Sequence, residues 1–112
     1  MTEIKDMRRQ GDVLLVARGE APADAKPVER EGGRIVLMHG EVTGHSHAVL
    51  ERDAVLVETG TADAVERWLK VGASGAVLVH EEHSAHELLP NTDYEQWQQF
   101  EYTPQEIQRV AD

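Results

Sequence analysis

Short apolar runs rich in Val, Leu and Ile alternate with turn residues along most of the chain. Runs of this length, enriched in β-branched residues and bounded by Gly, Pro or Asp, are typical of strands rather than helices. Their recurrence at roughly 8–12 residues predicts an all-β fold, a small antiparallel β-barrel or sandwich. We expect one β domain over residues 1–112, with a polar lead-in at 1–10. The runs are GDVLLVARG at 11–19, RIVLMHG at 34–40, GHSHAVLE at 44–51, AVLVETG at 54–60 and AVLVHEEH at 76–83.

Residues 61–72 (TADAVERWLKVG) fit two patterns. Their apolar residues make a helical stripe, but Val65, Leu69 and Val71 also follow the alternation of a strand. Because strand-like runs flank the segment on both sides, we favour a strand over 65–71. YEQWQQFEY at 94–102 alternates in the same way and predicts a half-exposed strand.

The last residues carry a helix-start pattern. Thr103 is placed as an N-cap, Pro104 follows at the first helical position, and Glu106 comes three residues after the cap. This is the spacing of a capping box, in which the two side chains satisfy each other's free backbone N–H groups. It predicts a short C-terminal helical turn.

Charge and composition narrow the classes of function. The 112 residues carry a net charge of −10, from 21 acidic and 11 basic residues. Such a surface repels a phosphate backbone, so nucleic-acid binding is not expected. No apolar run has the roughly 20 residues needed to span a bilayer, and residues 1–10 lack the apolar stretch of a signal peptide. We therefore expect a cytoplasmic protein without membrane contact.

The chain has no cysteine, so a metal ion could be held only by nitrogen and oxygen. Its histidines lie between His39 and His86, in two groups. On a strand, His45 and His47 share one face with Cβ atoms about 6–7 Å apart, which lets both imidazoles reach one ion. His80 and His83 follow the apolar run at 76–79.

These two groups predict a metal site of His45, His47 and His83. His80 is the fourth ligand or supports a ligand, and His86 remains an alternative. Zinc is the first expectation, because it favours imidazole, with iron, nickel and manganese open. Glu82, between two of the histidines, is the candidate catalytic base, acting on a small-molecule substrate by hydration or hydrolysis.

Two other interpretations stay open. The first is a non-enzymatic protein in which a closed shell of histidines holds a structural metal ion. The second needs no metal, because histidines that titrate near pH 6.5 can form a pH-sensitive interaction surface. A homodimer is also expected, because short strands leave edges to cover and the strand with Trp97 is apolar enough to pair.

The segment GEVTGHSHAVLE at 40–51 is similar to the first motif of the cupins, in which Gly precedes His-x-His and a Glu follows. Cupins are small β-barrels that hold a divalent metal ion with these residues. The resemblance implies that His45, His47 and Glu51 are metal ligands.

A second resemblance covers most of the chain. The segments GDVLLV, GEVTGHSH, VHEEH, EYTP and RVAD, in this order, resemble a family of small bacterial and phage proteins with no activity attached to it. This resemblance leaves His39 and His86 outside the pattern. It implies a characteristic polar set of His45, His47, His80, Glu82 and His83.

Overall fold

The computed structural model describes residues 3–40, 42–61, 64–97, 100–102 and 107–109, and every regular element in these ranges is a β-strand. The strands are β1 (Asp6–Gln10), β2 (Val13–Ala17), β3 (Lys26–Pro27), β4 (Ile35–His39), β5 (Ser46–Val49), β6 (Val55–Thr61), β7 (Ala64–Val71), β8 (Ala76–Leu78), β9 (His86–Leu88), β10 (Thr92–Trp97), β11 (Phe100–Tyr102) and β12 (Ile107–Arg109).

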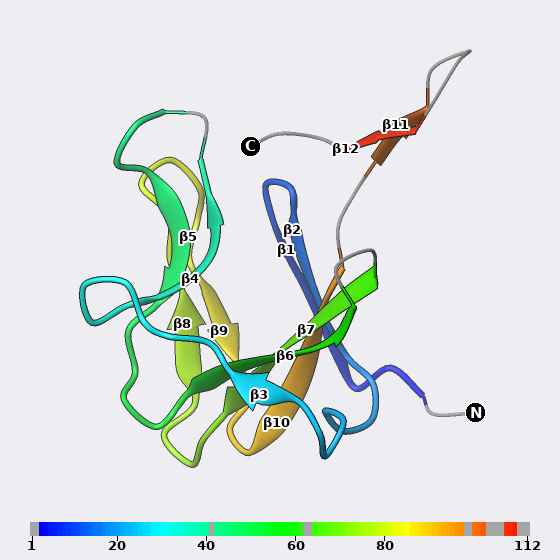
Figure 1. Ribbon diagram of the computed structural model, residues 1–112. Coiled ribbons are helices and arrows are strands. Elements are labelled where there is room, and N and C mark those ends of the chain that lie inside the picture. Colours follow the sequence, from blue (N-terminus) through cyan, green and yellow to red (C-terminus); the bar gives the residue numbers. More distant parts are fainter. Residues whose placement is uncertain (1–2, 41, 62–63, 98–99, 103–106, 110–112) are drawn as a thin grey trace.

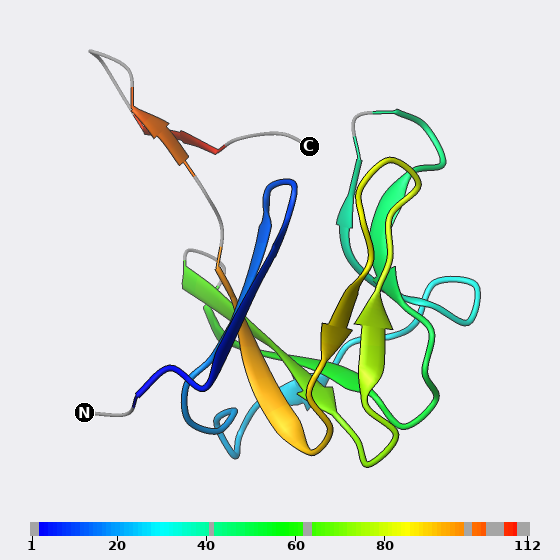
Figure 2. The same cartoon turned by 180° about the vertical axis from the view of Figure 1, so that it is seen from behind.

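One layer is a six-stranded antiparallel sheet in the order β1-β2-β10-β7-β6-β3. The second layer consists of two hairpins, β4-β5 and β8-β9, which face this sheet in Figures 1 and 2. A backbone bridge joins the hairpins: Ala48 N donates to Val79 O at 3.0 Å, and Val79 N donates to Ala48 O at 2.9 Å. The all-β antiparallel prediction is confirmed, and the described strands form a sandwich-like arrangement rather than a closed barrel.

The core lies between the two layers, and both layers contribute apolar side chains to it. Alternation within the strands explains the composition, since every second residue of β2 and β7 points to the same side. Burying one such side chain stabilises the fold by about 1.5–3 kcal/mol. The buried cluster comprises Val13, Leu15, Ala17, Ile35, Leu37, Val49, Ala54, Leu56, Leu69, Val71, Ala76, Leu78, Leu88 and Tyr94.

Polar contacts also join the layers at Leu37. The pairing of β4 with β5 shifts register between Val36 and Met38, so Leu37 is an extra residue without a cross-strand partner. Its carbonyl oxygen accepts hydrogen bonds from Arg67 Nη1 on β7 at 3.1 Å and from Gln96 Nε2 on β10 at 3.0 Å. The shift in β4 thus makes one carbonyl available to the opposite sheet.

The strand favoured over 65–71 is confirmed, because Ala64–Val71 pairs with β6 on one side and β10 on the other. The lead-in at 1–10 is more ordered than its polarity suggested. Its residues Asp6–Gln10 form β1, which pairs along its whole length with β2. A charged strand is stable at this sheet edge because its outward side chains remain in water.

Two expectations are wrong. Ile107–Arg109, placed in the C-terminal helical turn, form β12 and pair with β11, so the ladder rather than a helix satisfies their backbone groups. Thr103, Pro104 and Glu106 lie outside the described residues. The strand with Trp97 is not an available edge either, because β10 already pairs with β2 and β7, whereas the homodimer itself stays a prediction. Arg18 lies over the Trp97 ring, 5.5 Å from its centre.

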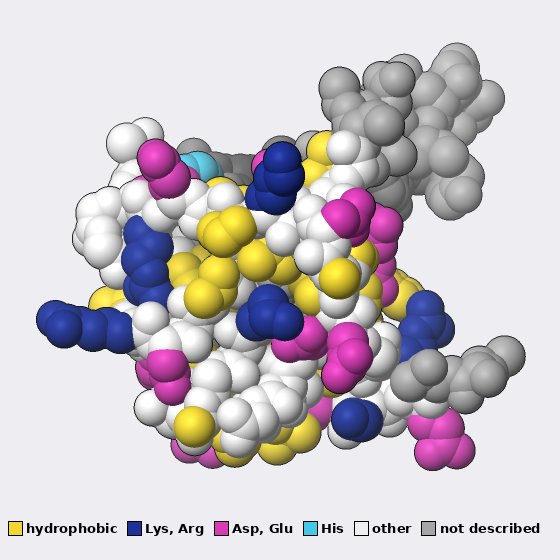
Figure 3. Space-filling model, turned by 60° about the horizontal axis from the view of Figure 1, so that its bottom comes forward, with side chains coloured by type: hydrophobic (Ala, Val, Ile, Leu, Met, Phe, Trp, Pro, Cys, Tyr) yellow, Lys and Arg dark blue, Asp and Glu magenta, His cyan; other side chains and the backbone are white. Residues whose placement is uncertain are grey.

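The described residues include no helix with the length and hydropathy that crossing a membrane requires. On the face shown in Figure 3, acidic and basic side chains are interspersed, with apolar side chains between them.

Candidate metal centre

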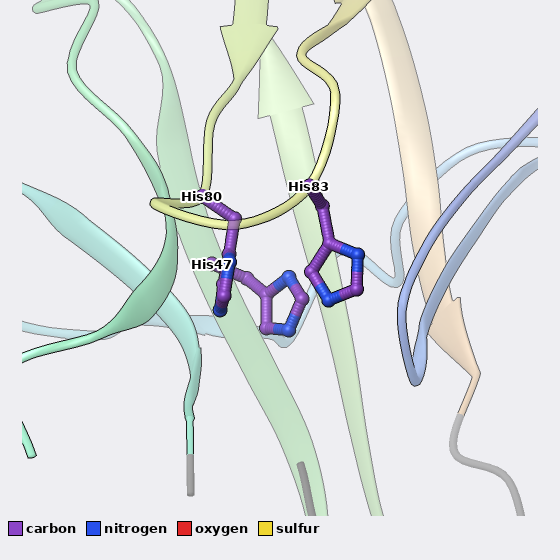
Figure 4. A group of neighbouring side chains, drawn as sticks. All are labelled: His47, His80 and His83. Carbon is purple, nitrogen blue, oxygen red and sulfur yellow. The ribbon is translucent and has the colours of Figure 1, made fainter. Parts of the chain in front are cut away.

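Three histidines from two distant segments meet at one end of the hairpin layer. His47 lies on β5, whereas His80 and His83 belong to the loop between β8 and β9 (Figure 4). One potential ligand atom from each lies within 4.8 Å of the others. Nitrogens that share one ion at about 2.0–2.1 Å are at most about 4.2 Å apart. The three histidines are therefore close to the spacing that a common ion requires.

The fold brings these histidines together through the backbone bridge between Ala48 and Val79. His47 and His80 each lie directly beside a bridged residue, so their rings become neighbours, with centres 4.3 Å apart. The His80 and His83 ring centres are 4.6 Å apart, and those of His47 and His83 are 5.7 Å apart. His47 is fully buried, His80 is half-buried and His83 is exposed, so the group extends from the core to solvent.

Gln10 at the end of β1 fixes the tautomer of His47. The Gln10 amide nitrogen donates to Leu78 O at 3.0 Å and to Ser84 O at 2.9 Å, which uses both of its N–H groups. Its oxygen therefore faces His47 Nδ1, 2.9 Å away, and that ring nitrogen must carry the hydrogen. The lone pair of neutral His47 is then on Nε2. Metal-bound histidines commonly donate their other N–H in this way.

His80 has the opposite tautomer. The backbone N–H of Glu82 donates to His80 Nδ1 at 2.9 Å, so this nitrogen acts as an acceptor. A neutral imidazole has one donor and one acceptor nitrogen, and His80 therefore carries its hydrogen on Nε2. His47 and His80 therefore differ in the nitrogen that carries the lone pair. It is Nε2 in His47 and Nδ1 in His80.

His45 lies beside the group rather than in it. Its ring is edge-on to His80, with the centres 5.9 Å apart, and its Nδ1 is 3.8 Å from Glu82 Oε1. Strand β5 begins at Ser46, so His45 belongs to the hairpin turn, where Gly40 N donates to its carbonyl at 2.8 Å. The alternation that places His45 and His47 on one face applies only within a strand. The Glu82 side chain is 61% exposed.

Glu81 anchors the histidine loop, and the sequence did not single it out. Its carboxylate accepts a hydrogen bond from Ser46 N at 2.9 Å, next to His47 on the chain. This hydrogen bond is the main reason that the pKa of Glu81 lies below its ordinary value of 4.5. Nothing in the sequence separates Glu81 from its neighbour Glu82, and Gln10 carries no signal either, because it lies far along the chain in a polar segment.

The remaining candidates lie apart from the three histidines. Glu51, a ligand in the cupin resemblance, instead accepts a hydrogen bond from Val77 N at 3.3 Å. His39 pairs with Glu31 at 3.0 Å on the surface, and His86 lies on β9. Neither belongs to the group that could share an ion among the described residues.

A cavity of about 410 Å³ is formed by other segments: the end of β7, the start of β10 and residues that follow β2. Lys70 and Asp93 line it, and no histidine does. The three histidines therefore lie outside this cavity, and the candidate site is defined by their nitrogen atoms.

The fold and this side-chain group define a sandwich-like all-β protein with a candidate metal centre. Residues 9–99 match the model of a family described as a domain of unknown function (DUF8820), and the chain belongs to this family. The matched range includes Gln10 and both histidine segments, but not EYTP at 101–104 or RVAD at 109–112. Comparison with curated proteins and with solved structures gives no match.

Proposed function

We propose that the chain binds one divalent transition-metal ion through His47, His80 and His83, and that the bound ion serves hydration or hydrolysis of a small-molecule substrate. Zinc is the first candidate ion, and iron, nickel and manganese share the preference for imidazole. The donor set fits these ions because it consists of borderline nitrogen ligands, with no thiolate in a chain that lacks cysteine.

The observation that carries the proposal is the hydrogen bond between His47 and Gln10. A fully buried histidine needs a partner, but this partner also sets which nitrogen carries the lone pair. An amide whose two N–H groups are held by Leu78 O and Ser84 O cannot turn over to offer a donor instead. Such orientation of a histidine by its other nitrogen is the usual arrangement at metal sites.

A divalent ion held by His47, His80 and His83 would supply Lewis-acid chemistry that makes water a nucleophile near pH 7. His83 is exposed, so a substrate can approach from its side of the group. The carboxylate of Glu82 and the imidazole of His45 lie 3.8 Å apart at the same end. We assign to this pair the acceptance and transfer of the proton.

The first test is metal content. Protein purified without a histidine tag, stripped by chelation and dialysed against zinc, should retain one ion per chain by elemental analysis. His83→Ala should lose most of this zinc. His83 is exposed, so the variant should fold normally. His86→Ala, three residues further along the same segment, is the matched control and should retain zinc.

Equal zinc loss in both variants, or full zinc content in a His47→Gln, His83→Ala double variant, would contradict the site. The reaction class is tested separately on the zinc-loaded protein, with carbon dioxide hydration and the hydrolysis of an activated ester. Metal binding without either activity, together with unfolding on chelation, would support a structural metal site instead.

A further inference from the structure

We infer that metal binding at this site is coupled to a backbone latch: the hydrogen bond from Glu82 N–H to His80 Nδ1 must break before His80 can hold an ion. The inference rests on the proposed function and adds a device that controls it. The N–H of this hydrogen bond belongs to the peptide between Glu81 and Glu82, which lies between two of the proposed ligands along the chain.

The exclusion follows from the valence of a neutral imidazole, which has one N–H and one lone pair. In the structure the Glu82 N–H, 2.9 Å away, occupies the lone pair of His80 Nδ1. An ion at Nδ1 would displace this donor directly. An ion at Nε2 would require the ring hydrogen to move to Nδ1, where it would face the Glu82 N–H as a second donor. Coordination through either nitrogen therefore removes the hydrogen bond.

The surrounding contacts confine the change to a few residues. On the N-terminal side of the Glu81–Glu82 peptide, the bridge from Val79 to Ala48 holds the chain, and the Glu81 carboxylate accepts a hydrogen bond from Ser46 N. After it, Ser84 O accepts from the buried amide of Gln10 at 2.9 Å. The Glu82 peptide and the exposed His83 lie between these anchors. Rotation of this peptide can therefore free His80 while both ends of the loop stay in place.

The arrangement makes the three ligands unequal. His47 is held by Gln10 with its lone pair on Nε2, the lone pair of His80 Nδ1 accepts from Glu82 N–H, and His83 is exposed on the segment that must rearrange. The backbone carrying Glu82 changes between the metal-free and metal-bound states, so the carboxylate assigned to proton transfer changes its surroundings only when the ion is present.

Nuclear magnetic resonance of the wild-type protein tests the latch directly. In the zinc-free protein, the His80 ring should show the tautomer with its hydrogen on Nε2, and the Glu82 amide should be protected from hydrogen exchange. Addition of zinc should convert His80 to a metal-bound ring and abolish the protection of the Glu82 amide. The Gln10 side-chain amide should remain protected in both states.

A pair of variants tests the energetics. Glu82→Pro removes the N–H donor, whereas Glu82→Ala removes the carboxylate but keeps the N–H. Because one hydrogen bond no longer has to break, zinc should bind to Glu82→Pro about 3- to 10-fold more tightly than to Glu82→Ala. The Ser46 and Gln10 amide resonances report whether the proline variant retains the native loop. If the variant loses the native loop, the magnetic resonance experiment on the wild-type protein decides whether the hydrogen bond breaks.

The outcomes separate the latch from the site itself. If zinc binds at His47 and His83 while His80 keeps its tautomer and the Glu82 amide stays protected, the latch is wrong and the metal site stands. If zinc leaves all three histidine rings unchanged, the proposed function is wrong and the latch falls with it. Equal zinc affinity in a natively folded Glu82→Pro and in Glu82→Ala would also overturn the latch.

Discussion

His47 Nδ1 donates a hydrogen bond to Gln10 Oε1 at 2.9 Å, although 37 positions separate the two residues along the chain. Neither side chain is more than 1% exposed. Gln10 in turn holds Leu78 O and Ser84 O, the carbonyls on either side of the loop that carries His80 and His83. One amide thereby orients a proposed ligand and fixes the loop that brings the other two.

Replacing Gln10 with Met should therefore weaken both the fold and the site. His47 Nδ1 and Leu78 O, both in buried hydrogen bonds, and the part-buried Ser84 O would lose their partner. Each buried loss costs about 1–3 kcal/mol. Zinc affinity should fall by about 10- to 100-fold, the usual effect of removing a group that orients a metal-bound histidine. Isothermal titration and denaturant unfolding measure the two effects.

Gln96→Met is the matched control for this change. Gln96 is also buried and also donates to a backbone carbonyl, that of Leu37, but it makes no hydrogen bond to the three histidines among the described contacts. The control should lower stability and leave zinc affinity within about twofold. A similar loss of affinity in both variants would show that Gln10 acts only through stability.

Gly40 should be sensitive to the addition of a single methyl group. A Cβ at this position would lie 3.2 Å from His45 Cβ and 3.4 Å from His80 Nε2. The distance to His45 is shorter than an ordinary contact, so the turn at His45, whose ring lies edge-on to His80, must give way. Gly40→Ala should lower zinc affinity severalfold at a stability cost of about 1 kcal/mol. Gly72→Ala, whose Cβ would meet Asp53 at 2.6 Å, should destabilise the fold more and leave zinc affinity intact.

Glu82→Gln tests the assigned role of the carboxylate. The side chain is 61% exposed and lies 3.8 Å from His45 Nδ1, so it is not required to hold the ion. Zinc content should remain at the wild-type level, while the rate of hydration or hydrolysis falls by about 100-fold or more. Glu87→Gln, an exposed glutamate on β9, should change neither quantity. Loss of zinc in Glu82→Gln would instead identify Glu82 as a ligand.

Acid stability should depend on Tyr94 and Asp6. Burial raises the pKa of Asp6, but hydrogen bonds from Tyr94 and Arg8 outweigh this and hold it below 3.8. Burial and the bond to Asp6 raise the pKa of Tyr94 to about 12. Because the pKa of Asp6 is lower in the folded state, its contribution is complete above the unfolded value and is lost as pH falls through the folded value.

Tyr94→Phe should therefore cost about 1–3 kcal/mol near neutral pH, because Leu89 N–H also loses its acceptor. The variant should then lose stability less steeply than the wild type as pH falls below about 4. Denaturant unfolding at several pH values measures both effects. Parallel curves for the two proteins would show that the pair does not titrate with folding.

Local patterns were sufficient for the strands but not for every chain end. The alternation at 65–71 predicted a strand only when the flanking strands were considered. The structure explains this, because β7 pairs with both β6 and β10, and this pairing outweighs a weak helical stripe. The capping pattern at Thr103 failed over Ile107–Arg109 for the same reason. A cap contributes about 1 kcal/mol, which a strand partner can exceed.

For the site, the sequence predicted which segments come together more reliably than how their side chains are held. Grouping along the chain indicated His45, His47, His83 and His80, and the fold brings the last three of these together. It could not predict that His45 falls in the turn before β5, because strand ends are set by pairing. The roles of Gln10 and Glu81 depend on long-range contacts with the histidine loop and with Ser46, which leave no local pattern.

The hydrogen bonds to the Leu37 carbonyl make β4 respond differently to substitutions and to deletions. The hydrogen bonds that Arg67 and Gln96 make to it involve only the backbone of β4, so substitutions of the Leu37 side chain leave the acceptor in place. The extra residue nevertheless sets the pairing that places Met38 opposite His47. Deleting one residue from β4 would therefore shift the hairpin by one position and turn alternate side chains to the other face. The histidine group should tolerate changes of residue type in β4 far better than changes in its length.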